Sequence, residues 1–193
     1  MQLVDLTVTL VDLPYAVTRR LTVPAALRLT DLHLVLQAAL GWENSHMYDF
    51  SSGRSLRWSS MKFEFGDPDD RSAATSTLAD VLAEIGCRKS FCYTYDMGDS
   101  WEHDLVPSKP RDAVAGEAII ALHDAVGRCP PEDSGGAPGF GYMLDCLADP
   151  ESDEYQTYVE WLSGPTFDRT ANVALQTKQV AAVAKRLAKR YQD

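Results

Sequence analysis

Alternating hydrophobic and polar residues predict β-strands at the start of the chain. Apolar side chains occupy every second position from Val4 to Leu10, which is typical of a strand that buries one face. After a turn near Pro14, the same alternation returns between Val17 and Val23 and ends at Pro24. These two segments and the short turn between them predict an antiparallel hairpin.

Two segments carry the spacing of amphipathic helices. From Asp31 to Leu40 the apolar residues form one stripe, with Thr30 as a candidate N-cap and Gly41 as the stop. A shorter stripe from Leu78 to Ile85 follows Thr77, which opens a capping box with an acid three residues later. We therefore expect one helix after the first hairpin and a second, short helix further along.

Strand patterns return around and after these helices. Extended segments are predicted at 46–50 and 56–65. A second hairpin fits 91–95 and 101–105, because aromatic residues alternate with polar ones on both sides of the turn Asp96-Met97-Gly98-Asp99-Ser100.

The last third of the chain changes character. Residues 128–141 are so rich in glycine and proline that we expect a shaped loop with no regular element. Helices are predicted beyond it at 142–148, 151–162 and about 170–191, and Pro150 and Pro165 follow the first two.

The order of elements predicts a single α+β domain over residues 1–193. Residues 1–127 would form a mixed β-sheet with two helices, in a β-grasp-like order of hairpin, helix and strands, with helices packed on one face. Residues 128–141 would form the shaped loop, and residues 142–193 a helical C-terminal extension.

Charge narrows the range of partners. The chain has 18 Lys and Arg against 28 Asp and Glu, a net charge of −10, so phosphates are repelled overall and nucleic acid is an unfavoured partner. No stretch reaches the roughly 20 apolar residues of a membrane helix. We expect a cytoplasmic protein without a membrane partner. The four cysteines form no CxxC pair, which favours thiols over disulfides or a zinc site.

One basic segment departs from this acidic balance. No acid lies between Arg169 and Gln192, while Lys and Arg recur along the predicted last helix beside an apolar stripe. The stripe residues are Val173, Val180, Val183, Ala184 and Leu187. A nucleic-acid surface is one interpretation. The other is that the cations complement the helix dipole and pair with an acidic face elsewhere.

The candidate chemistry gathers in the second hairpin and the breaker-rich loop. The hairpin Tyr93–Asp104 concentrates acids, aromatic residues and a histidine around a glycine turn. This composition suits a binding rim, or a tight turn whose acids cap backbone N–H groups while the aromatic residues pack in the core. With the loop Cys129–Gly136 it supplies the candidate binding residues Tyr95, Asp96, Asp99, Trp101, His103, Glu132 and Asp133. His103 shares a strand face with Trp101, which favours a core or rim histidine over a ligand or base.

The acids allow two interpretations. Eight carboxylates and no Lys or Arg lie between Pro130 and Glu160. If the loop packs across the hairpin, Glu132 and Asp133 meet the acids and histidine of the hairpin, a set of oxygen ligands with one nitrogen that suits Mg²⁺ or Mn²⁺. We favour the alternative, a structural network without a cofactor, in which the acids accept hydrogen bonds from backbone N–H groups. The expected donors are Gly98, Gly135 and Gly136.

Two motifs resemble the signature of the plasmid ORF-three-like family, which is named after an open reading frame of a root-inducing plasmid. The first runs from Tyr93 to His103, and the second from Cys129 to Gly136 with Gly141-Tyr142 after it. Further matching segments are Thr18-Arg19-Arg20, Val23-Pro24, Leu32-His33, Gly41–His46, Leu147–Pro150, Trp161-Leu162 and Phe167-Asp168. The resemblance covers nearly the whole chain, and it implies an α+β fold with no established biochemical activity.

The chain departs from the family pattern at two positions. Ser134 stands where the family commonly has a second cysteine, and Met97 stands where an aromatic residue is usual. Some members carry a TnpR-like label from a mobile element. A serine recombinase needs a nucleophilic serine near its N-terminus, but the first serine here is Ser45. The sequence therefore does not support the recombinase label. Arg19 and Arg20 are neighbours on a strand and so point to opposite faces, which excludes a shared phosphate clamp.

These observations leave two hypotheses. The favoured one is a non-enzymatic binding or interaction module, with a groove between the Tyr93–Asp104 hairpin and the Cys129–Gly136 loop for a peptide, a partner protein or a small ligand. The alternative is a divalent-metal-dependent hydrolase acting on a phosphoester. Whether the chain is an enzyme stays open at this stage.

Overall fold

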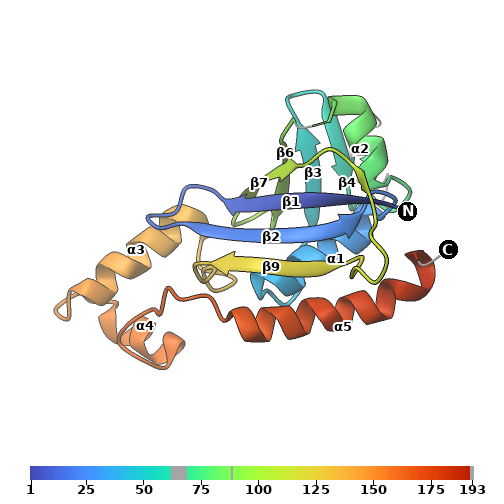
Figure 1. Cartoon of the computed structure of the whole chain (residues 1–193). Helices are drawn as coiled ribbons and strands as arrows, with labels where there is room; N and C mark the ends of the chain where they lie inside the picture. The colour runs from blue at the N-terminus through green and yellow to red at the C-terminus, as the bar shows by residue number, and fades with distance from the viewer. Residues whose placement is uncertain (62–68, 88, 192–193) are drawn as a thin grey trace.

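A nine-stranded mixed sheet forms the centre of the molecule (Figure 1). The computed structural model describes residues 1–61, 69–87 and 89–191. The strands run in the order β5-β4-β3-β6-β7-β1-β2-β9, and β8 pairs with β1 outside this path. β4 and β5 pair in parallel, whereas the other pairs are antiparallel. The strands are β1 Gln2–Leu10, β2 Val17–Pro24, β3 Tyr48–Ser52, β4 Leu56–Ser59, β5 Arg71–Ser72, β6 Phe91–Tyr95, β7 Trp101–Pro107, β8 Arg111–Asp112 and β9 Ala121–Val126.

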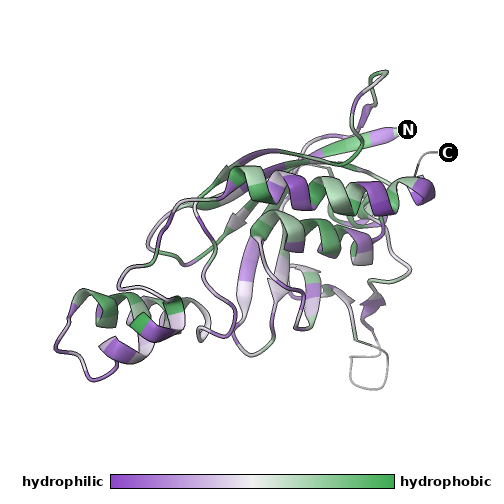
Figure 2. Ribbon diagram, turned by 90° about the horizontal axis from the view of Figure 1, so that it is seen from below, coloured by the Kyte–Doolittle hydropathy of each residue, from purple (hydrophilic) through white to green (hydrophobic). Residues whose placement is uncertain are grey.

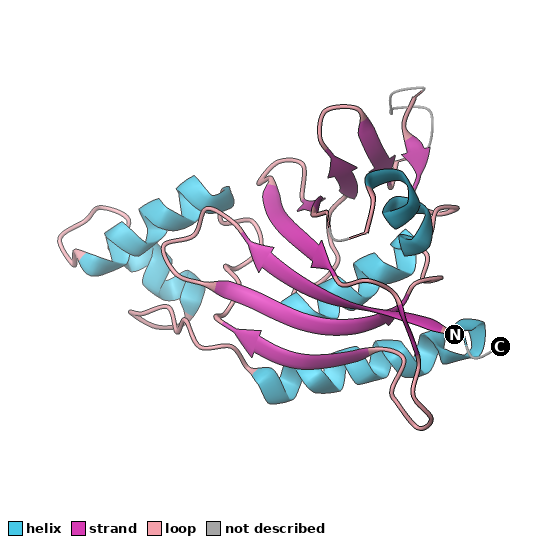
Figure 3. Ribbon diagram, turned by 45° about the horizontal axis from the view of Figure 1, so that its top comes forward, coloured by secondary structure: helices cyan, strands magenta, loops and turns pink. Residues whose placement is uncertain are grey.

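Five helices in the described residues complete the α+β fold that the sequence predicts. They are α1 Leu29–Leu40, α2 Leu78–Ile85, α3 Gly136–Ala148, α4 Tyr155–Leu162 and α5 Val173–Tyr191. α1 and α5 pack against each other behind β1, β2 and β9 (Figure 3). α3 and α4 project beyond the end of the sheet, away from α1 and α5 (Figure 2). None of the helices in the described residues is long and apolar enough to cross a membrane.

The β1–β2 hairpin is confirmed with the predicted alternation. Leu6 lies opposite Leu21, and both are buried. Arg19 is fully buried whereas Arg20 is exposed, so the two arginines do point to opposite faces. The Arg19 guanidinium donates to the carbonyl oxygens of Ala39 at 2.6 Å and Val126 at 2.8 Å. A buried cation therefore joins the hairpin to α1 and β9.

The two predicted helices of the first half exist, but the start of α1 was predicted wrongly. Arg28 is the N-cap and Thr30 lies inside the helix. Backbone pairing decides this start, because Leu29 N–H donates to the Ser76 carbonyl. α2 opens with the predicted capping box of Thr77, whose hydroxyl accepts from the N–H three residues on.

The predicted loop 128–141 is partly helical, which corrects the sequence-based boundary. α3 begins at Gly136, after Gly135 in the left-handed conformation. Pro138 is tolerated because it lies in the first turn, where N–H groups have no partner within the helix. α4 begins at Tyr155 and α5 at Val173, later than predicted, since turns occupy 151–154.

Other strand boundaries also differ from the prediction. The segment predicted at 46–50 is β3, which starts at Tyr48. Within the described part of the second segment, residues 56–61, the strand is Leu56–Ser59. Residues 62–65 of that segment lie outside the described residues. β5, β8 and β9 were not predicted from the sequence.

α5 packs through the centre of its predicted apolar stripe. Val180 and Leu187 are buried, whereas Val173 at the start of the helix is exposed and corrects the prediction. Arg190 pairs with Asp31 of α1 at 2.9 Å, and Tyr191 donates to the same carboxylate at 2.6 Å. Arg190 of α5 therefore pairs with α1 and not with the acidic segment after Pro130.

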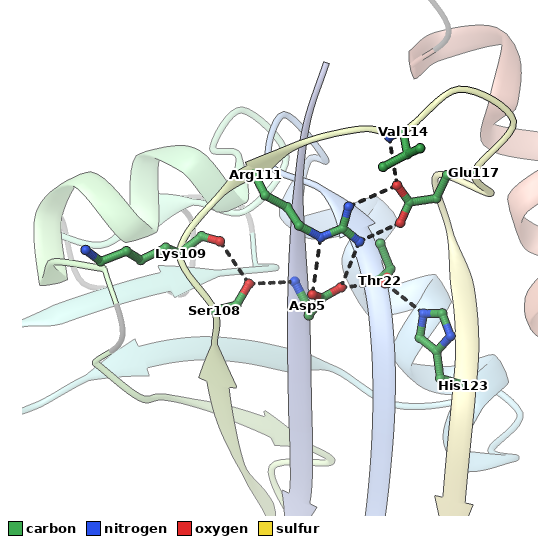
Figure 4. A network of polar contacts seen from close by, with 8 residues as sticks. All are labelled: Asp5, Thr22, Ser108, Lys109, Arg111, Val114, Glu117 and His123. Atoms are coloured by element: carbon green, nitrogen blue, oxygen red, sulfur yellow. Dashed lines mark hydrogen bonds and ion pairs between the residues drawn. The ribbon is translucent and has the colours of Figure 1, made fainter.

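A polar network fixes the connection between β7 and β9 to the outer face of the sheet (Figure 4). The Arg111 guanidinium lies between the carboxylates of Asp5 and Glu117, at 3.4 and 2.9 Å. The Thr22 hydroxyl donates to Asp5 at 2.6 Å and lies 2.8 Å from His123 Nε2. These contacts engage Asp5, Thr22 and His123 and reinforce the pairing of β8 with β1.

Candidate functional site

The second hairpin carries a row of buried aromatic residues toward α1. In the β6–β7 register Tyr93 lies opposite His103, and Tyr95 lies opposite Trp101. All four residues are at most 1% exposed. The alternation of the sequence therefore sets one face of the hairpin inside the core, as the interpretation of a packed hairpin predicts.

The acids of the hairpin turn bind backbone N–H groups. Asp96 accepts from Gly98 N–H through Oδ1 at 2.9 Å. Asp99 accepts from Gly135 N–H through Oδ2 at 3.0 Å. Two of the three predicted glycine donors thus bind these acids. Gly136 instead allows a close approach, because a Cβ on it would lie 2.2 Å from the Asp99 carbonyl oxygen.

The segment Pro130–Gly135, here called the Pro-Glu-Asp loop, lies directly on the hairpin turn. The Tyr95 hydroxyl donates to Glu132 Oε1 at 2.5 Å. Burial raises the pKa of Tyr95 above its ordinary value, and the hydrogen bond to the Glu132 carboxylate raises it further, so the phenol stays protonated. Together with the bond from Gly135 to Asp99, this contact fixes the loop at its middle and at its C-terminal end.

Trp42, which the sequence analysis did not select as a site residue, supports the loop from the end of α1. Its Nε1–H donates to the Pro130 carbonyl at 2.9 Å. Its ring stacks on Tyr95 with centroids 5.1 Å apart and meets His103 edge-on at 5.3 Å. The signal for Trp42 in the sequence is its position in the segment Gly41–His46, which matches the family.

His103 is a core histidine and does not meet the carboxylates. Nδ1 lies 3.1 Å from the Tyr93 carbonyl, which makes this nitrogen the donor and leaves Nε2 unprotonated. Nε2 has no hydrogen-bond partner among the described residues. Burial lowers the pKa of His103 to about 4, so the ring is neutral at physiological pH.

A second buried histidine orders the polar network under the hairpin. His33 Nδ1 lies 2.7 Å from the Tyr93 hydroxyl, which also accepts from Gln37 Nε2 at 3.0 Å. The other ring nitrogen of His33 contacts Asn44 Oδ1, and Asn44 N–H donates to Gln37 Oε1 at 2.9 Å. Burial lowers the pKa of His33 to about 4. This closed ring of hydrogen bonds positions the segment after α1.

The histidine that does meet the acids is His46. Its Nδ1 lies 3.5 Å from Asp96 Oδ2, and its Nε2 lies 3.2 Å from Asp133 Oδ1. His46 precedes β3, Asp96 directly follows β6, and Asp133 is in the Pro-Glu-Asp loop. The less favoured interpretation of the sequence had the loop and turn acids meet a histidine, and the histidine named there was His103. His46 lies far from these acids along the chain, so the sequence does not reveal its contact with them.

A pocket of about 650 Å³ opens on the other side of the Pro-Glu-Asp loop. This loop pocket lies between the end of α1, the loop and the start of α5. Its charged lining residues are the carboxylates Glu43, Glu132, Asp133 and Asp168 and the guanidinium of Arg128. Its lining amides include Asn172, Gln176 and Gln179. Carboxylates thus outnumber cations in the lining, and among the predicted site residues only Glu132 and Asp133 reach this pocket.

Comparison with known proteins places these motifs in a family. The model of the plasmid pRiA4b ORF-3-like protein matches residues 2–174. The chain belongs to the plasmid pRiA4b ORF-3-like family. It is 39% identical over 189 residues to the uncharacterised protein y4hQ of Sinorhizobium fredii (strain NBRC 101917 / NGR234). The matched region covers 97% of this chain and 95% of that protein.

A solved relative has the same fold. The crystal structure of a protein of unknown function from Methanosarcina mazei Go1 aligns with a TM-score of 0.74 and 28% identity, over 89% of this chain and 95% of that one. The family is one of uncharacterised function, so the plasmid pRiA4b ORF-3-like relationship gives the fold and the motifs.

Proposed function

We propose that this protein is a non-enzymatic binding module whose loop pocket holds a cationic group, an ammonium or a guanidinium. The observation that carries the proposal is the excess of carboxylates in the pocket lining, four against one guanidinium. A hollow lined by one sign of charge raises the local concentration of the opposite sign. Concave sites of a few hundred Å³ with a few placed polar groups are the usual form of small-ligand sites.

Gln176 supports a ligand that donates hydrogen bonds. This residue lines the pocket and is 5% exposed. Its Nε2 donates to the Leu40 carbonyl at 3.3 Å, and a carbonyl can only accept, so the orientation of the amide is set. Its Oε1 has no hydrogen-bond partner among the described residues. A buried acceptor without a partner is costly, and an N–H group of a ligand would supply one.

The hairpin acts as the support of this site in the proposal. Tyr95 and Asp99 bind the loop, and Trp101 packs against Trp42, which supports it. Glu132 and Asp133 line the pocket. The predicted groove between hairpin and loop is here replaced by the hollow on the outer side of the loop. The cationic group would belong to a small amine, or to a lysine or arginine of a partner peptide or protein.

Calorimetric titration tests the proposal. Spermine and a lysine-rich peptide are titrated into the chain in the presence of a chelator, with the same peptide acetylated on every lysine as the neutral probe. We expect saturable binding of both cations that weakens with salt, and no binding of the acetylated peptide. Glu43→Gln should weaken binding, whereas Asp153→Asn, an acid outside the pocket lining, should not. Equal binding by the two variants, or none by the wild type, would contradict the proposal.

A metal-dependent phosphoester hydrolase is the second candidate, and the convergence of His46, Asp96 and Asp133 is the observation that favours it. The carboxylates of the loop pocket oppose it, because they repel a phosphate group. Hydrolysis of bis(p-nitrophenyl) phosphate with added Mn²⁺ tests this candidate. Turnover that is lost in Asp133→Asn would establish it, and we expect none.

A further inference from the structure

Three residues from three separate segments bring one nitrogen and two oxygens together beside the loop pocket. His46, Asp96 and Asp133 each offer a ligand atom, and these atoms all lie within 4.8 Å of one another. The geometry points to a divalent-metal site at these residues, a transition-metal ion such as Mn²⁺ or Zn²⁺. This site does not rest on the proposed function of the pocket.

The charges of the cluster call for a cation. Among the described residues, the ion pairs of Asp96 and Asp133 are with His46 alone. Asp96 is 8% exposed, and a carboxylate this deeply buried needs compensation. One imidazole cannot neutralise two carboxylates, whereas a divalent ion can. Because an imidazole nitrogen is part of the set, Mn²⁺ or Zn²⁺ suits it better than Mg²⁺, which prefers oxygen ligands alone.

The surroundings orient each ligand. Gly98 N–H occupies Oδ1 of Asp96 and leaves Oδ2 for an ion. The His46 ring meets the Tyr95 ring edge-on at 5.7 Å, which fixes its plane. His46 Nε2 is buried and has no hydrogen-bond partner of good geometry among the described residues. Outer contacts of this kind hold the ligands of metal sites in proteins.

The site would connect three pieces of chain that do not share secondary structure. A bound ion would join the segment before β3, the turn after β6 and the Pro-Glu-Asp loop. Three protein ligands leave coordination positions for water, and Asp133 also lines the loop pocket. The ion would therefore stabilise the loop that forms the pocket wall.

Metal titration of the tag-free, chelator-treated chain tests the site. Free Mn²⁺ is followed by electron paramagnetic resonance and Zn²⁺ by calorimetry, in wild type, His46→Gln and Asp133→Asn. We expect one saturable site per chain, weakened more than about tenfold in either variant, because even outer partners of metal ligands contribute that much. Asp99→Asn is the matched control: Asp99 lies in the same turn but outside the cluster, and asparagine keeps an acceptor for the Gly135 N–H that holds the loop. This variant should keep the wild-type affinity.

A spectroscopic signature separates ligation from loss of folding. Electron spin echo modulation from the imidazole nitrogen should be present with wild type and Asp99→Asn, and absent with His46→Gln. Circular dichroism confirms that each variant is folded. Absence of saturable Mn²⁺ and Zn²⁺ binding in the wild type, or unchanged affinity in both His46→Gln and Asp133→Asn, would overturn the inference. Glu43→Gln removes a carboxylate of the pocket lining that lies outside the metal cluster. This variant should keep the wild-type metal affinity even if it loses binding of a cationic ligand, so failure of the metal site and failure of the cation pocket can be told apart.

Discussion

The hydroxyl of Tyr95 donates a hydrogen bond to Glu132 at 2.5 Å and accepts one from Ser45 N–H at 2.9 Å. One side chain of β6 thereby holds both the segment after α1 and the Pro-Glu-Asp loop. These are two walls of the loop pocket. The position of the pocket thus depends on an aromatic residue of the hairpin that does not itself reach the pocket.

Tyr95→Phe should destabilise the protein although it keeps the ring. The change leaves the Glu132 carboxylate and the Ser45 N–H without this partner, and the expected loss is about 1–3 kcal/mol of the free energy of unfolding. Tyr155→Phe is the matched control, because the Tyr155 hydroxyl has no hydrogen bond among the residues that the structure describes. Urea unfolding measures both. Equal stability of the two variants would show that the Tyr95 contacts do not hold the loop.

Gly136→Ala should displace the loop. Gly136 has a φ of +66°, and an added Cβ would lie 2.2 Å from the Asp99 carbonyl oxygen. Gly141→Ala is the matched control in the same helix, because its Cβ would meet open space. Alanine there should stabilise the helix by about 0.5–1 kcal/mol. Thermal unfolding should show opposite changes in the two variants, and parallel changes would contradict the close packing of loop on hairpin.

Trp101→Ala should be among the most damaging single changes in the hairpin. Trp101 is 1% exposed, so its truncation leaves a large cavity, and we expect a loss of about 3–5 kcal/mol. Trp161 in α4 is 46% exposed, and Trp161→Ala should lose far less. Denaturant unfolding compares them. A loss below about 1 kcal/mol for Trp101→Ala would place the hairpin at the surface and not in the core.

Acid should destabilise the fold through its buried histidines. Burial lowers the pKa of His103 from 6.5 to about 4. Between these two pH values the His103 ring is protonated in the unfolded chain but neutral in the folded chain. The free energy of unfolding is therefore highest above pH 6.5, and it declines by up to about 3 kcal/mol as the pH falls to about 4. His103→Asn keeps an N–H donor but does not titrate. The free energy of unfolding of this variant should depend less on pH over this range. An identical pH dependence in wild type and variant would refute the claim that His103 is held neutral in the folded chain.

Local patterns were sufficient to predict most of the central sheet and α2. The alternation in β1 and β2 and the Thr77 capping box act between neighbours in sequence, so they can be recognised without tertiary contacts. The start of α1 was predicted wrongly because backbone pairing with the segment at Ser76 decides it. α3 was predicted to start at residue 142 and not at Gly136, because Gly136 and Pro138 break helices in the interior and are tolerated only at the first turn.

The candidate site was predicted only as far as its segments. The sequence located the turn acids, the loop acids and the contact between hairpin and loop. It did not identify Trp42 or His46, whose roles arise from contacts with residues about 50 to 90 positions further along the chain. The pocket itself depends on the start of α5, which carries no pattern that links it to the loop.

Chemical-shift mapping by NMR tests the central claim, that the loop pocket binds a cation, most directly. Amide spectra of the ¹⁵N-labelled chain are recorded while spermine is added in the presence of a chelator. The account predicts that saturable shifts concentrate at Glu43, Asp133 and Gln176. Shifts centred instead on the outer face of the sheet at Thr22 and His123, or no saturable shifts, would contradict it.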